Sequence, residues 1–239
     1  MRRIISGLAA IAVVTSTVAL APVASASSSI SGKGSSFANN FLAKCITSYH
    51  AATGNTVTYD PAGSGAGRTA YANSTVDFAV SDVPYQASDT AKPATGSFLY
   101  VPLTGGPVAI AYNITGVKTG LKLTPVVLSK IFKGTITTWN DPAILKLNKT
   151  LSAAQKTKLT GNISVIRRGT KSGTTQNLQA YLHTVADSSW PAADGNWAGV
   201  TGTSAANSAA LVDAIKSTAG SIGYADLSDT AGNSLTFVA

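Results

Sequence analysis

The chain contains little sulfur, little histidine and little charge. Among its 239 residues are one cysteine, Cys45, and two histidines, His50 and His183. A single cysteine cannot form an internal disulfide, and it excludes cysteine-based metal sites of the usual kind. Cys45 lies in an apolar stretch with helical spacing, so we expect its side chain to be buried. The two histidines lie far apart on separate helical stretches, so we expect capping or surface roles for both.

Charged residues make up only 12% of the chain, with 18 Lys and Arg against 10 Asp and Glu. The sequence has no dense basic run that alternates with aromatic residues, which argues against nucleic acid as a partner. The modest positive excess instead suits a small anionic ligand or an acidic cell wall.

The first 26 residues differ from the rest of the chain. Arg2 and Arg3 precede a mostly apolar stretch over 4–20, and Ala24-Ser25-Ala26 forms a small-residue cleavage motif. This pattern is typical of a secretory signal peptide and favours cleavage after Ala26 over a membrane anchor. Cleavage leaves 16 basic against 10 acidic residues, a net charge of +6. No cysteine follows closely enough to take a lipid, so we expect an exported protein without a lipid anchor.

The rest of the chain alternates between short β-branched runs and stretches with helical apolar spacing. This alternation is typical of α/β architecture with largely parallel sheets, in which ligands bind at the carboxyl ends of the strands. We expect residues 188–204 to be mostly loop. The expected strands lie near Ile30 and over 56–59, 76–80, 99–103, 108–112, 163–166 and 221–227.

Three predicted corners between a strand and a helix share one chemistry. They are Gly34-Ser35-Ser36, Gly63-Ser64-Gly65 and Ser172-Gly173-Thr174. Each corner places hydroxyl groups and glycine N–H groups at a helix start, where unpaired N–H groups and a partial positive charge favour an anion. An ordinary helix cap explains any one of them as well. The three together predict a cage of hydrogen-bond donors.

An arginine and a carboxylate stand at the ends of two predicted strands. Arg168 follows the strand over 163–166, and Asp82 follows the strand over 76–80. Arg168 is suited to binding an oxyanion through two parallel hydrogen bonds. Asp82 could accept the proton that phosphate keeps near neutral pH, and it would repel sulfate, which has none. A simple turn or helix cap is the alternative role for Asp82.

Enzyme motifs have weaker support. Ala62 and Ala66 occupy the glycine positions of a G-x-S-x-G elbow around Ser64, and residues 63–67 do not form G-x-G-x-x-G. The spacing of serine, histidine and aspartate does not favour a catalytic triad. We therefore expect no catalytic residues, no bound metal and no cofactor.

Several segments together, in their order along the chain, resemble a known family, the phosphate-binding proteins of bacterial phosphate ABC transporters. The resemblance covers about residues 32–227 and implies a periplasmic-binding-protein type II fold, with two α/β lobes and a ligand cleft at the hinge. It implies a first lobe over 27–98, joined by the C-terminal tail 228–239, and a second lobe over 99–227. The segments are Gly34–Phe37, Gly63–Gly67, Val76–Asp82, Ile131–Gly134, Trp139–Pro142, Arg167-Arg168, Ser172–Thr174 and Gly220–Tyr224.

The resemblance also implies a ligand, a partner and a set of binding residues. The ligand is inorganic phosphate, the partner is an ABC permease, and we expect a monomer secreted into the periplasmic or cell-surface space. The implied phosphate contacts are Ser36, the Phe37 backbone N–H, Ser64, Asp82, Arg168, Ser172, Gly173 and Thr174.

Two features depart from the family pattern. Thr170 stands where an aspartate usually orients the binding arginine, and Lys171 follows it. We expect this change to hold Arg168 less firmly and to make the site more positive. The chain also ends soon after the Gly220–Tyr224 segment, so it is either a short form or a fragment whose first lobe is incomplete.

Three other functions remain open at this point. A protein of this fold could bind another oxyanion, such as sulfate or molybdate. It could also be a secreted phosphate sensor or scavenger without a transporter. A secreted hydrolase of phosphate esters is the third alternative, and the lack of a metal-ligand cluster in the sequence argues against it.

Overall fold

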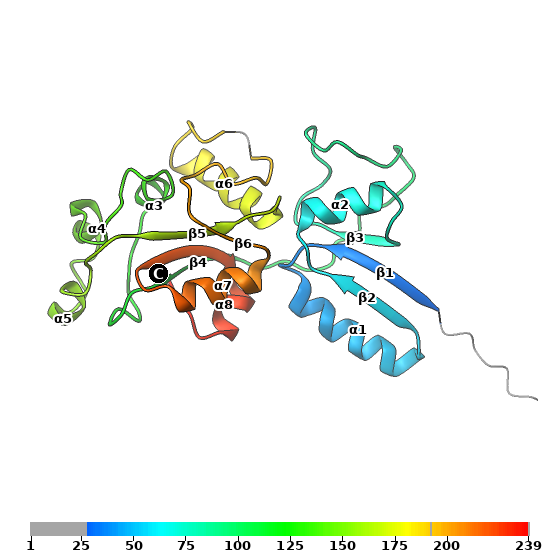
Figure 1. The fold of residues 1–239 in the computed structure, drawn as a ribbon, viewed down its shortest axis with the longest axis horizontal. Coiled ribbons are helices and arrows are strands. Elements are labelled where there is room, and N and C mark those ends of the chain that lie inside the picture. The colour runs from blue at the N-terminus through cyan, green and yellow to red at the C-terminus, as the bar shows by residue number, and fades with distance from the viewer. Residues whose placement is uncertain (1–27, 192, 239) are drawn as a thin grey trace, which may run out of the picture.

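The computed structural model describes residues 28–191 and 193–238. The predicted signal peptide and its cleavage site lie outside this range. The described chain forms two α/β lobes side by side along the long axis, each built around its own sheet (Figure 1). Within the described ranges, we find no helix that is both long and apolar enough to cross a membrane.

Lobe 1 is the region built on a parallel three-stranded sheet with the strand order β2-β1-β3. Figure 1 shows its two helices on opposite sides of this sheet. In this sheet the loops after β1 and β3 leave the same edge, because the strands are parallel. The elements are β1 (Ser29–Gly34), α1 (Asn39–Thr53), β2 (Thr56–Asp60), α2 (Ser64–Ala72) and β3 (Phe78–Val80).

Lobe 2 is the region built on a five-stranded sheet with the strand order β6-β5-β7-β4-β8. Strand β5 runs parallel to β6 and β7, whereas β4 runs antiparallel to β7 and β8. The expectation of largely parallel sheets is therefore confirmed for lobe 1 and for β6-β5-β7, and it is wrong for β4 and β8. The elements are β4 (Val108–Asn113), α3 (Pro125–Phe132), α4 (Pro142–Leu147), α5 (Ala153–Lys156), β5 (Ser164–Arg168), α6 (Gly173–Val185), β6 (Thr203–Ala205), α7 (Ser208–Ser217), β7 (Ser221–Asp226), α8 (Leu227–Gly232) and β8 (Thr236–Phe237).

The apolar core of lobe 2 fixes the position of β5. Phe132, Trp139 and Tyr224 are almost fully buried in the larger core cluster, and Ile166 lies in a second cluster that packs against α7. The Trp139 indole also donates a hydrogen bond of 2.9 Å to the Gly220 carbonyl, just before β7. Burial of side chains of this size contributes roughly 1.5–3 kcal/mol each, so the carboxyl end of β5 is held on a rigid base.

Several sequence-based expectations were wrong, because a local sequence pattern does not show which distant parts of the chain will pack against it. Cys45 is exposed, since Leu42 is the residue that α1 buries. Residues 99–103 do not form the predicted strand, and Leu99 is 90% exposed. This apolar run contains Pro102, which cannot donate to a strand ladder. The expectation that 188–204 is mostly loop is confirmed for its described residues, and only Thr203 and Ser204 belong to β6.

The C-terminal tail also differs from the expectation that it joins lobe 1. Strand β8 pairs with β4 in the sheet of lobe 2, and the Val238 N–H donates to the Ile110 carbonyl at 2.9 Å. The reason is that β4 has an edge opposite β7 whose backbone groups need partners. The tail also contacts lobe 1 through α8, where the Asn40 amide donates to Ser228 and Asp229.

Both histidines contact backbone carbonyl groups. His50 Nδ1 lies 2.9 Å from the Asn55 carbonyl after the end of α1, and His183 Nδ1 lies 2.8 Å from the Trp190 carbonyl. These contacts agree with the capping or surface roles expected from the sequence.

Candidate functional site

Arg168 stands at the carboxyl end of β5 and is only 2% exposed. Its guanidinium Nη1 donates hydrogen bonds of 3.1 Å to Ser36 Oγ of lobe 1 and to Ser172 Oγ of lobe 2. Burial lowers the pKa of Arg168, and the nearby acidic groups of Tyr224 and Asp82 oppose this effect. Arginine keeps its proton in proteins, so Arg168 supplies a buried cation at the junction of the two lobes.

Thr170 helps to orient Arg168. The guanidinium Nη2 donates to Thr170 Oγ1 at 3.1 Å and to the Ala206 carbonyl at 3.0 Å, and the Thr170 hydroxyl itself donates to the same carbonyl at 3.1 Å. Thr170 therefore contacts Arg168, and the expectation that it holds Arg168 less firmly than an aspartate would stays a prediction. The Thr170 hydroxyl, fixed by the Ala206 carbonyl, offers the guanidinium one neutral acceptor, which binds it less strongly than a carboxylate would.

The first hydroxyl corner reaches both lobe 2 and the carboxylate of lobe 1. Ser36 Oγ accepts from the Ser208 N–H at 3.2 Å and lies 2.9 Å from Ser208 Oγ at the start of α7. The Phe37 N–H donates to Ser35 Oγ at 3.1 Å, and the Ser35 hydroxyl donates to Asp82. Sequence reasoning missed Ser35 and Ser208 as site residues. Ser35 belongs to the same corner as Ser36, and Ser208 begins a helix after Asn207. A hydroxyl residue close before or at a helix start, the pattern used to predict the other corners, could therefore have identified both.

Asp82 follows β3 and is partly buried. Its carboxylate accepts from the hydroxyls of Ser35 and Thr174, the latter at 3.4 Å across the lobes, and its own N–H donates to Ser64 Oγ at 3.2 Å. Burial raises the pKa of Asp82, and the hydrogen bonds from Ser35, Ser64 and Thr174, with the charge of Arg168, act against this rise. Asp82 is thus an acceptor among hydroxyl donors.

Gly173 brings the start of α6 against the corners of lobe 1. A Cβ atom built at Gly173 would lie 2.6 Å from Ser64 Oγ and 2.7 Å from Asp82 Oδ2, so a larger residue does not fit. Ser172 caps the helix, because its Oγ accepts from the Thr175 N–H at 3.3 Å. The N-terminus of α6 and its partial positive charge therefore face the same junction.

The structure brings the predicted site residues from both lobes to one junction. Seven of them make the contacts described above, and Phe37 joins them through Ser35. Their role as contacts of a bound ligand stays a prediction. The arrangement can bind a small oxyanion, since it combines one buried cation, several hydroxyl donors and a single carboxylate acceptor.

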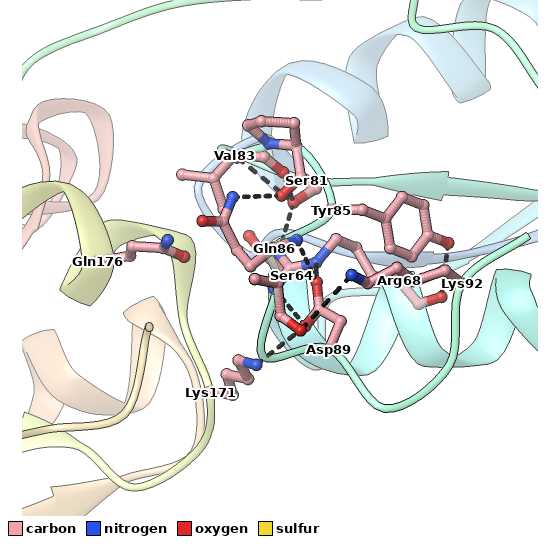
Figure 2. Close-up of polar contacts among 12 residues, drawn as sticks. Ser64, Arg68, Ser81, Val83, Tyr85, Gln86, Asp89, Lys92, Lys171 and Gln176 are labelled. Atoms are coloured by element: carbon pink, nitrogen blue, oxygen red, sulfur yellow. Dashed lines mark hydrogen bonds and ion pairs between the residues drawn. The ribbon is translucent and has the colours of Figure 1, made fainter. Parts of the chain in front are cut away.

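A charged cluster lies beside this junction (Figure 2). Arg68 donates to Asp89 from Nε at 2.8 Å and from Nη2 at 3.0 Å, and Lys171 Nζ lies 2.9 Å from Asp89 Oδ1. Asp89 is shared by Arg68 and Lys171, so this cluster of two cations and one carboxylate keeps a net positive charge, and the expectation of a more positive site stays a prediction. Burial raises the pKa of Asp89, but the bonds from Arg68, the Gln86 N–H and Lys171 outweigh it and hold this pKa well below its usual range.

An apolar cleft of about 770 Å³ opens next to the junction on the side of lobe 1. Asp82 and Thr174 are among its lining residues, together with Phe78, Phe98 and residues 99–103. A small anion needs hydrogen-bond donors to replace its water, so the polar junction, rather than this cleft, is the candidate binding site.

Comparison with known proteins places the chain in a family. The model of a PBP superfamily domain matches residues 21–238. A phosphate-binding protein of Mycobacterium bovis, PstS2, is 38% identical over 209 residues, which are 84% of this chain and 55% of the relative. The phosphate-binding protein PstS of Xylella fastidiosa is 35% identical over 217 residues, covering 88% of this chain and 56% of the relative. The chain thus spans about half the length of the curated relatives it matches.

Solved structures share the fold at low sequence identity. A Clostridium perfringens protein described as a phosphate ABC transporter substrate-binding protein, solved with bound phosphate, superposes with a TM-score of 0.67 at 18% identity. That match covers 88% of this chain and 74% of the other. A phosphate-binding protein of Stenotrophomonas maltophilia gives a TM-score of 0.59 at 21% identity and covers 84% of this chain and 60% of the other. With a family model that matches nearly all of the described residues and a fold of two α/β lobes, this chain belongs to the PBP superfamily.

Proposed function

We propose that this chain binds inorganic phosphate between its two lobes and is the substrate-binding component of a phosphate ABC transporter. The observation that carries the proposal is that Arg168 and Asp82 lie at one junction, where each of them bonds hydroxyl groups of both lobes. The names of the curated relatives, which are phosphate-binding proteins, support the same ligand.

The donors at the junction suit a tetrahedral anion. Arg168 Nε is buried and has no hydrogen-bond partner among the residues that the structure describes, which leaves one guanidinium donor for a ligand. The Thr174 hydroxyl can rotate from Asp82 to an anion, and the hydroxyls of Ser36 and Ser172, which accept from Arg168, can donate their own hydrogens to it. Charge-assisted bonds of this kind are stronger than bonds between neutral groups.

Asp82 supports phosphate over sulfate. Phosphate carries at least one proton near neutral pH, and that proton can be donated to the Asp82 carboxylate. Sulfate has no proton to donate, so its oxygen would face the carboxylate oxygen, and neither could supply the hydrogen. A site with a partly buried acceptor therefore disfavours the fully deprotonated anion.

The contacts across the junction also support closure of the lobes on the ligand. An anion that touches Arg168 of lobe 2 and Ser64 of lobe 1 interacts fully only when the lobes are together, so binding favours the closed arrangement. We further propose that the protein is exported after cleavage near Ala26, is a monomer, passes phosphate to an ABC permease and has no enzymatic activity of its own.

Calorimetric titration of the mature chain, residues 27–239, with phosphate and then with sulfate and molybdate tests the ligand. We expect heat of binding with phosphate and none with sulfate at neutral pH. Equal binding of sulfate or molybdate would show a general oxyanion protein. A folded sample that binds none of these anions would reject the proposal.

Two further measurements test the other functions. Release of a chromogenic alcohol from a phosphate ester would show a hydrolase, and we expect none. Deletion of the gene in its host should reduce uptake of radioactive phosphate at low external concentration. Normal uptake by the deletion strain, with tight binding in vitro, would instead indicate a sensor or scavenger.

A further inference from the structure

Lys171 reaches across the junction from lobe 2 to lobe 1. It lies on the loop between β5 and α6, and its Nζ is 2.9 Å from Asp89 Oδ1 (Figure 2). The Lys171 side chain is 24% exposed and that of Asp89 is 8% exposed, so this ion pair is partly shielded from solvent. Shielded pairs interact more strongly than fully exposed ones.

Asp89 is fixed in lobe 1 independently of Lys171. Arg68, whose side chain is 2% exposed, donates two hydrogen bonds to the Asp89 carboxylate, and the Gln86 N–H donates a third at 2.7 Å. Arg68 also donates to Ser81 Oγ at 3.0 Å, and Ser81 directly precedes Asp82. Lobe 1 therefore presents a preformed carboxylate beside the anion site, and Lys171 does not need to order it.

Two glycines hold the stem of Lys171 in place. A Cβ atom built at Gly65 would lie between 2.7 and 3.0 Å from three carbons of the Lys171 side chain, and one built at Gly195 would lie 3.1 Å from its Cγ. The Gly65 N–H also donates to the Lys171 carbonyl at 3.2 Å. The unbranched stem thus runs between two backbone segments that have no side chains there, which reduces the entropy cost of ordering it.

The ion pair differs from the contacts between side chains of the candidate anion site that join the lobes. The bonds from Arg168 to Ser36 and from Thr174 to Asp82 use the groups that an anion would engage, so a bound anion replaces them at least in part. Lys171 and Asp89 lie outside that set and can stay paired when an anion is bound.

We propose that Lys171 is a positioning residue that latches lobe 2 onto lobe 1 through Asp89, both without and with a bound anion. A contact present only when the lobes are closed raises the population of the closed form. The apparent affinity for a ligand that needs this form rises with that population. The effect on phosphate affinity rests on the proposed function, whereas the effect on closure does not.

Distance measurements between the lobes test the latch directly. Cys45 on α1 is exposed and can carry one spin label, and Ala154→Cys on α5, also exposed, can carry the second. Without phosphate, Lys171→Met keeps an unbranched stem but removes the charge, and we expect a longer and broader distance distribution. Lys171→Arg keeps the charge and should retain the shorter distance.

Lys133→Met is the matched control. Lys133 is 26% exposed and forms a 2.7 Å ion pair with Asp187 inside lobe 2, so the variant loses the same charge without a bond between lobes. We expect its distances to equal those of the wild type. Raising the ionic strength from about 0.01 M to about 1 M should lengthen the wild-type distance toward that of Lys171→Met, because salt screens the pair. Equal distances in the wild type and Lys171→Met at low salt would overturn the latch.

Calorimetry then separates the latch from the proposed function. We expect Lys171→Met to weaken phosphate binding by roughly three- to tenfold, the range for a partly shielded ion pair. Gly65→Ala should do the same, because its methyl group displaces the lysine stem. A wild type that binds no phosphate would reject the proposed function, and the label distances would still decide on the latch. A wild type that binds phosphate with the same affinity as Lys171→Met, and with unchanged distances, would reject the latch alone.

Discussion

Arg168 and Ser36 lie 132 residues apart in the sequence and share a hydrogen bond of 3.1 Å between the two lobes. Ser36 Oγ also accepts from the N–H of Ser208, so one serine of lobe 1 contacts two elements of lobe 2. This serine therefore joins the carboxyl end of β5 and the start of α7 to the first corner of lobe 1. A ligand that binds at Arg168 meets groups from both lobes at once.

Thr170 should tune the affinity through Arg168. Thr170→Val removes the hydroxyl that accepts from Arg168 Nη2 and keeps a similar side-chain shape, so we expect phosphate binding to weaken by about 0.5–1.5 kcal/mol, the scale of one hydrogen bond. Arg168→Ala should cost about 1.5–3 kcal/mol or more, because it removes charged bonds. Calorimetric titration measures both variants. The idea fails if Thr170→Val binds phosphate as tightly as the wild type.

Asp82 should govern the choice between phosphate and sulfate. In Asp82→Asn, the amide can donate where the carboxylate only accepts, so we expect sulfate binding to appear and the preference for phosphate to shrink. Competition titrations at neutral pH give the ratio of the two affinities. A variant that still excludes sulfate as strongly as the wild type would remove Asp82 from this role.

The same substitution should stabilise the folded protein at neutral pH. Because burial raises the pKa of Asp82, the folded state holds its proton to a higher pH than the unfolded state, and the free energy of unfolding falls as pH rises above the ordinary carboxyl value of 3.8. Asp82→Asn has no carboxyl group to ionise at position 82. Its free energy of unfolding should therefore fall less as pH rises than that of the wild type. Thermal melts of both proteins in phosphate-free buffer at acid and neutral pH provide the test, and parallel pH profiles would contradict it.

Gly173 should be required for close approach of the lobes. Gly173→Ala places a methyl group within 2.7 Å of Ser64 Oγ and Asp82 Oδ2, so we expect the lobes to separate and phosphate affinity to drop at least tenfold. Gly232→Ala is the control, since a Cβ atom there meets no atom within 4 Å of the described structure. Both variants should keep the wild-type circular dichroism. Unchanged affinity in Gly173→Ala would show that the lobes need not come this close.

A second carboxyl group should affect stability away from the binding site. Burial and the neighbouring Asp226 raise the pKa of Asp229 to about 7, while a hydrogen bond from Asn40 acts against this rise. The folded state therefore holds this proton over a range where the unfolded state has lost it. The free energy of unfolding from this group falls as pH rises from about 4 to about 7.

Asp229→Asn should remove this part of the pH dependence and raise the melting temperature at pH 8 relative to the wild type. Asp213→Asn is the control, because Asp213 is an exposed aspartate on α7. Melting curves at pH 5 and pH 8 decide the question. The assignment is wrong if Asp229→Asn and the wild type lose the same stability between these two pH values.

Local patterns in the sequence predicted much of the candidate site. The Ser172-Gly173-Thr174 corner was recognisable because capping depends on a few consecutive residues, and Ser172 does cap α6. The order of strands and helices followed from apolar spacing for the same reason. Ser35, in the loop after β1, and Ser208, at the start of α7, were missed because a hydroxyl does not reveal its partner until the chain is folded.

The sequence by itself determined most of the short strands and helices and the three hydroxyl-rich corners, since these depend on backbone geometry and neighbouring side chains. Tertiary structure alone decided which corners meet. The contacts of Arg168 with Ser36, of Asp82 with Thr174 and of Lys171 with Asp89 join residues 132, 92 and 82 positions apart. It also left Cys45 exposed and paired β8 with β4 in lobe 2. Such outcomes depend on how sheets and helices pack over long distances along the chain, which no local pattern encodes.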